Sequence, residues 1–133
     1  MTNRQYSEMS DEQLAQAFVE ISIKQADAIG LRRVRTTNKL FEELRSVAET
    51  LRARGLAARN VLVPLLSYSA VPSPFAKDGT AQVRLNAAKE LLAVVPDQAR
   101  ATLENIAAHG PSAQRGRAGM CLQLLDDGVF KPT

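Results

Sequence analysis

Residues 81–92, AQVRLNAAKELL, form the stretch from which the fold can be inferred. Val83, Ala87 and Leu91 recur at helical spacing and predict a helix that buries one face. Arg84 directly follows the first of these apolar positions, and a charged side chain beside a buried valine needs a structural reason. That reason should lie in how this helix meets its neighbours.

A similar pattern returns near the C-terminus. Aligning Arg84 with Arg115, an offset of 31 residues, also places Ala87 on Ala118. An offset of this size corresponds to one helix–turn–helix unit, so it predicts a helical solenoid built from repeated helix pairs.

Helix-end signals divide the rest of the chain. Ser10 and Gln13 have the spacing of a capping box, and Gly30 and Gly55 are typical helix ends. The most regular apolar stripe lies between these glycines, so the first two helices should form an antiparallel hairpin. The expected helices are 10–30, 34–54, 60–68, about 80–94, 96–109 and 112–128, with Pro64 tolerated in the third, Ser112 capping the last, and a strand as the alternative for 61–63.

No segment shows a convincing strand alternation, so we predict an all-α protein of about six helices. Residues 1–9 are polar and are expected to be flexible, and residues 10–133 are expected to form a single domain. Gly116 and Gly119 fall inside the last helix, where small residues should permit close approach of a neighbouring helix.

Several residues of the first unit follow a known spacing. PLL at 64–66, Asp78, Val83-Arg84, Ala87-Ala88 and Leu91 together resemble a HEAT repeat, with a proline in its first helix and an aspartate at the turn between helices. The loop 69–77 is then an insertion between the proline and the aspartate. The resemblance implies that Arg84 reaches back to Asp78 in a structural ladder. A planar guanidinium suits this role because it can bind a carboxylate through two hydrogen bonds.

The second unit departs from that spacing. Arg115 is the ladder arginine of this unit, but His109 stands where the aspartate should be and Gln114 where the valine should be. The acidic half of the ladder is therefore missing, and this unit is interpreted as a terminal cap.

The order of motifs resembles a small bacterial family of uncharacterised single-domain proteins. NKLF, PLL, VRLNAAKELLAVVPDQARATLENIA and AGMCL occur in that order between residues 10 and 132. The resemblance implies a right-handed α-α superhelix of the HEAT and armadillo type, with an N-terminal helical hairpin followed by HEAT-like repeats. It implies no activity, because the family has none that can be transferred.

Composition narrows the function only slightly. The formal net charge of +3 permits an acidic partner without demanding one. One cysteine, Cys121, cannot form an internal disulfide, and no apolar run is long enough to suggest a signal peptide or a membrane span. We therefore expect a cytoplasmic protein that does not associate with membranes.

No pattern predicts catalysis, a cofactor or a metal site. Cys121 lies on an apolar helical face and is interpreted as a core residue, and His109 as a helix-end residue. One histidine and one cysteine are too few for a zinc site. The carboxylates Glu42 and Glu49 lie among basic residues and suggest a solvated helix face. A non-enzymatic role is expected.

The remaining candidates for function are surface arginines. Arg32, Arg33 and Arg35 form the densest basic run, and Arg117 adds a separate position on the last helix. Because stacked helices present rows of exposed side chains, we predict a protein–protein interaction module, in one form an immunity- or antitoxin-type protein that masks its partner. Binding of nucleic acid is the alternative, since the same arginines could contact phosphates.

Overall fold

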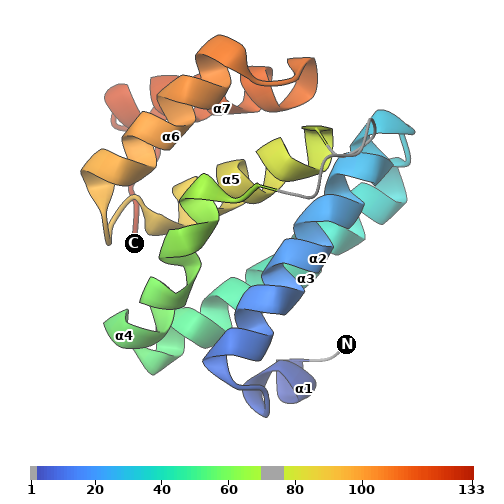
Figure 1. Ribbon diagram of the computed structural model, residues 1–133, viewed down its shortest axis with the longest axis vertical. Coiled ribbons are helices and arrows are strands. Elements are labelled where there is room, and N and C mark those ends of the chain that lie inside the picture. The colour runs from blue at the N-terminus through green and yellow to red at the C-terminus, as the bar shows by residue number, and fades with distance from the viewer. Residues whose placement is uncertain (1–2, 70–76) are drawn as a thin grey trace.

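The computed structural model describes residues 3–69 and 77–133, and it contains helices and no strand within those ranges. The prediction of an all-α fold is confirmed (Figure 1). Residues 70–76, most of the insertion expected between Pro64 and Asp78, lie outside the described residues. The elements are α1 (Asn3–Ser7), α2 (Asp11–Gly30), α3 (Val34–Arg54), α4 (Leu56–Arg59), the 3₁₀ helix η1 (Asn60–Ser67), α5 (Lys77–Leu91), α6 (Pro96–His109) and α7 (Ser112–Asp126).

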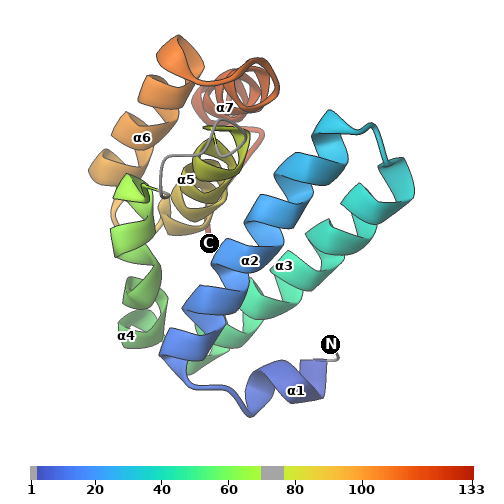
Figure 2. The ribbon, with the colours of Figure 1, turned by 45° about the vertical axis from the view of Figure 1, so that its right-hand side comes forward.

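Helices that are neighbours in the sequence pack against one another. The long helices α2 and α3 form the expected antiparallel hairpin, and α6 and α7 form a second pair. Figures 1 and 2 show α5 between these two pairs. It contacts α2, η1, α6 and α7, so it is the central helix of the domain.

Residues around most of the circumference of α5 are buried. Val83, Leu85, Ala87, Ala88 and Leu91 are each at most 1% exposed. A helix that is apolar or small-sided on nearly all faces must be enclosed by other elements. The alanines let neighbouring helices come close, and the leucines fill the space between them.

Two predicted helix starts are confirmed and one is corrected. Ser10 Oγ accepts a hydrogen bond from the Gln13 amide at 3.1 Å, and Gln13 Oε1 accepts one from the Ser10 amide at 2.9 Å, which completes the capping box. Pro96 is the first residue of α6. In α7, however, Pro111 is the N-cap and Ser112 is already helical, so no side chain caps that helix.

The N-terminal residues differ from the expected flexible segment over 1–9. Residues Asn3–Ser7 are helical, and Tyr6 is only 3% exposed. Arg54, at the end of α3, donates to Asp11 Oδ1 at 2.8 Å and to the Ser7 carbonyl at 3.0 Å. These bonds hold the turn between α1 and α2 against the hairpin. The burial of one tyrosine in a polar segment was the feature that composition could not reveal.

Gly116 and Gly119 act differently from the prediction. A Cβ atom placed on Gly116 or Gly119 would meet nothing within 4 Å, so these residues do not serve a close helix contact. Gly30 is the last residue of α2, as predicted, and the left-handed residue beyond that helix is Arg32, with φ of 56°. Gly55 does require its freedom, because its φ of 106° is strained for any residue with a side chain.

We predict opposite effects for two glycine substitutions. Gly55→Ala should lower the free energy of unfolding by about 1–3 kcal/mol because of its backbone conformation. Gly116→Ala should raise it by about 0.5–1 kcal/mol, since alanine favours the helix and the site has room. Urea denaturation measures both changes. A neutral Gly55→Ala variant would contradict the conformation assigned to this turn.

Candidate functional site

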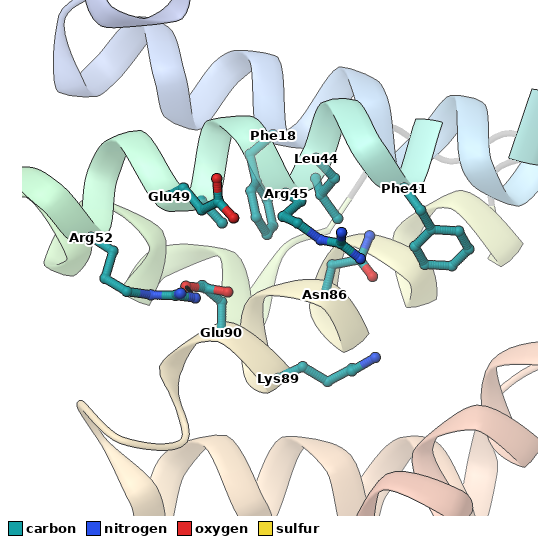
Figure 3. A pocket seen from close by; sticks show the side chains of 10 residues that line it. Phe18, Phe41, Leu44, Arg45, Glu49, Arg52, Asn86, Lys89 and Glu90 are labelled. Atoms are coloured by element: carbon teal, nitrogen blue, oxygen red, sulfur yellow. Dashed lines mark hydrogen bonds and ion pairs between the residues drawn. The ribbon is translucent and has the colours of Figure 1, made fainter. Parts of the chain in front are cut away.

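A groove of about 450 Å³ lies between α3 and α5 (Figure 3). Its lining combines apolar side chains from the hairpin with charged side chains from both facing helices. These residues are Phe18, Phe41, Leu44, Arg45, Ala48, Glu49, Arg52, Asn86, Lys89 and Glu90. The groove therefore has an apolar floor and a charged rim.

Helical periodicity explains how one stretch of α3 supplies both floor and rim. Leu44 and Ala48 belong to the stripe that packs on α2, and they are buried. Arg45 follows Leu44 by one residue, which rotates its side chain about 100° around the helix. On α5, Asn86, Lys89 and Glu90 are spaced three and four residues apart and so share one face.

One end of the groove is neutralised by ion pairs. Arg52 Nη2 lies 2.6 Å from Glu90 Oε1, and Arg59 Nη2 lies 3.7 Å from the same oxygen. Arg59 also donates to the Glu90 backbone carbonyl at 2.7 Å. The Glu90 carboxylate is thus committed to two arginines and links α5 to the end of the hairpin.

The middle of the groove carries cations without a carboxylate partner. Arg45 and Lys89 lie on the two sides of Asn86 in Figure 3, and neither makes an ion pair with a residue that the structure describes. Both are exposed at the rim. Their charge is available to a ligand that enters the groove.

Arg117 does not line the groove, but it is the one predicted partner residue that contacts a lining side chain, that of Phe41. Its guanidinium carbon lies 5.3 Å from the centre of the Phe41 ring, an arrangement typical of a cation–π contact. This contact joins α7 to the rim of α3. Arg32, Arg33 and Arg35 are exposed at the tip of the hairpin instead.

A chain of buried polar side chains extends from Asn86, which lines the groove, into the interior. Asn86 Nδ2 donates to Ser22 Oγ at 2.9 Å and to Gln25 Oε1 at 2.7 Å, which joins α5 to α2. Gln82 Nε2 donates to Asn86 Oδ1 at 3.1 Å, and Gln114 Nε2 donates to Gln82 Oε1 at 3.0 Å, which joins α5 to α7. We call these five residues the amide network.

The amide network is satisfied at its centre and open at its ends. Asn86 uses both its amide nitrogen and its oxygen, whereas Gln25 Nε2 and Gln114 Oε1 are buried without a hydrogen-bond partner. The network was not predicted from the sequence. Its signal was the occurrence of Ser22 with Gln25, and of Gln82 with Asn86, at helical spacing on otherwise apolar faces.

The predicted ladder between Asp78 and Arg84 is not present. Arg84 Nε donates to the Tyr68 carbonyl at 2.6 Å, and Asp78 is exposed without forming an ion pair to Arg84. The reason is that Asp78 lies inside the first turn of α5 and not in the preceding turn of the chain. Six residues of helix then separate the two side chains by about 9 Å along the axis and place them on different faces.

Arg115 does not continue a ladder either. Its side chain is exposed and forms no ion pair with the described residues. The adjacent Gln114 faces α5 instead and is fully buried. Gln114 aligns with Val83, which is fully buried as well, so both units turn the same position inward.

The remaining candidates for chemistry stand apart from the groove. His109 is exposed at the last position of α6, and Cys121 is buried in the core, where burial raises the pKa of its thiol. No cluster of three or more potential metal ligands occurs among the described residues. Of the helices in the described ranges, none has the length and apolar character needed to cross a bilayer.

The molecule is thus an all-α domain with a mixed apolar and basic groove beside its central helix. The model of a family described as a domain of unknown function (DUF2019) matches residues 12–126, and the chain belongs to this family. The crystal structure of the protein RPA1889 from Rhodopseudomonas palustris CGA009 is similar, with a TM-score of 0.83 and 38% sequence identity. The similarity covers 96% of this chain and 97% of that one. No curated protein matches the sequence.

We predict that Asn86→Ala lowers the free energy of unfolding by about 2–4 kcal/mol, because it leaves buried groups on both α2 and α5 without partners. Asn105→Ala on the exposed face of α6 is the control and should change stability by less than about 0.5 kcal/mol. Chemical denaturation of both variants checks this. Equal stability of the two variants would show that the amide network adds nothing.

We also predict that the Cys121 thiol reacts slowly in the folded protein. Burial raises its pKa and shields it, while Lys89 opposes the pKa shift only in part. Alkylation by iodoacetamide near neutral pH, followed by mass spectrometry, should be at least about tenfold slower than in urea. A thiol that reacts equally fast in both conditions would contradict its burial.

Proposed function

We propose that this domain is a non-catalytic protein-binding module that captures an acidic amphipathic segment of a partner in the groove between α3 and α5. The observation that carries the proposal is the pair of cations, Arg45 and Lys89, that flank an apolar floor without carboxylate partners. Apolar side chains of the segment would pack against Phe41 and Leu44, and its carboxylates would meet the two cations.

The rim of the groove suits a segment that belongs to a larger partner. Arg45, Lys89 and Arg117 are exposed, so a ligand can reach them without being enclosed. Phe41 and Arg117 add the aromatic and arginine side chains that are enriched at protein interfaces. A partner that covers them would extend its contact from α3 across to α7.

We further propose that the helices follow a HEAT-like right-handed superhelix and that the module acts in the bacterial cytoplasm. The packing of successive helices in chain order supports the first point, and the single cysteine is compatible with the second. Masking of a partner protein, as immunity- or antitoxin-type proteins do, is one form of this function.

The composition of the groove disfavours nucleic acid as its occupant. Arg45 and Lys89 are only two cations, whereas binding of nucleic acid usually depends on contacts with several phosphates. The apolar floor also offers little to a sugar–phosphate backbone. Binding of nucleic acid in the groove would contradict the proposal.

The proposal can be tested by comparing two variants that carry the same change of charge. The groove variant is Arg45→Glu with Lys89→Glu, and the control is Arg33→Glu with Arg35→Glu at the hairpin tip. The wild type and both variants are immobilised and incubated with lysate of the source organism, with and without nuclease treatment. A protein captured by the wild type is then purified for calorimetry. The groove variant should bind it about ten- to a hundredfold more weakly, whereas the control should match the wild type.

A photoreactive phenylalanine at position 41 identifies what enters the groove. Cross-linking to a segment rich in both acidic and apolar residues supports the proposal. Capture that disappears with nuclease treatment, absence of any captured protein, or loss of binding only in the hairpin-tip control would overturn it.

A further inference from the structure

A second cleft lies on the other side of α5. It has a volume of about 370 Å³ and is lined by Leu66, Ser67, Arg84, Ala101, Thr102, Asn105 and Ile106. These residues come from η1, α5 and α6. Arg84 is two residues from Asn86, so its side chain leaves the helix about 200° around from the groove described above.

One hydrogen bond holds the guanidinium of Arg84 in place. Its Nε donates to the Tyr68 carbonyl at 2.6 Å, a short hydrogen bond that fixes the plane of the group. Both Nη atoms remain without a hydrogen-bond partner among the described residues, and neither is enclosed. A fixed guanidinium with two free nitrogens presents a fork that matches two oxygens of one anion.

The described lining of the cleft contains no carboxylate. Every other polar side chain there, on Ser67, Thr102 and Asn105, is neutral and can donate a hydrogen bond. Leu66 and Ile106 are buried beside them and reduce the competition from water. A partly buried cation among neutral donors lacks a counter-ion of its own.

We propose that this cleft binds a small oxyanion, a carboxylate or phosphate group, through Arg84. The two Nη atoms bind two of its oxygens, and Ser67, Thr102 or Asn105 binds a further one. The volume is near the lower end of the range for small-molecule sites, which suits a single anionic group better than a large ligand. The site does not depend on the groove, because it uses other residues on another face of α5.

The test is an NMR titration of the ¹⁵N-labelled protein with inorganic phosphate and, separately, with acetate, each at constant ionic strength. In the wild type, saturable shifts should appear at the amides of Ser67, Arg84, Thr102 and Asn105. Tighter binding of phosphate would assign the site to phosphate groups, and equal or tighter binding of acetate would assign it to carboxylates. Either result supports the proposal.

Two variants and a control make the titration decisive. Arg84→Gln removes the cation, and Asn105→Asp keeps Arg84 but supplies a carboxylate inside the cleft. Each should weaken binding about tenfold or more, and Arg35→Gln at the hairpin tip should not. Asn105 is exposed, so its substitution tests the cleft even if Arg84→Gln unfolds the domain. Shifts that never saturate, or equal binding by wild type and Asn105→Asp, would overturn the proposal.

Discussion

The hydrogen bonds of Asn86 set the position of the central helix. Small and apolar side chains enclose α5 but do not by themselves fix its rotation, because alanines and leucines tolerate several packings. The Asn86 amide donates to both Ser22 and Gln25 on α2, and it can do so in only one rotation of α5. The bond from Gln114 to Gln82 then holds α7 to the same register. Buried polar groups of this kind can favour one arrangement over alternatives of similar hydrophobic content.

The same rotation of α5 determines which of its side chains face the groove and which face the cleft. With Asn86 turned toward α2, Lys89 and Glu90 face the groove beside α3, and Arg84 faces the cleft beside η1 and α6. The groove contains cations beside an apolar floor, and the cleft contains a single cation beside neutral hydrogen-bond donors. A helix that is almost entirely buried thus contributes charged groups to two separate surfaces.

Patterns of residues that are close in the sequence predicted most of the fold. The sites could not be predicted in the same way, because they depend on contacts between helices that are distant in the sequence. The capping box at Ser10, the apolar stripe of α3 and the first-turn position of Pro96 depend only on nearby residues. The pairing of Gln82 with Gln114 depends on which face of α7 meets α5, and spacing alone does not determine that. The prediction of an Asp78–Arg84 pair was wrong for a related reason, since α5 begins one residue before Asp78. The groove combines residues of three helices, so its lining followed only from the structure.

The sequence separation of the buried bonds has a consequence for the order of folding. Asn86 is 64 residues from Ser22 and 61 from Gln25, whereas the hairpin and the α6–α7 pair form between elements adjacent in the chain. Docking of α5 onto α2 therefore closes a long loop, and the conformational entropy of that loop must be lost before the amides can pair. We therefore expect the two helical pairs to form early and independently, and the joining of the two halves across α5 to be the slow step of folding.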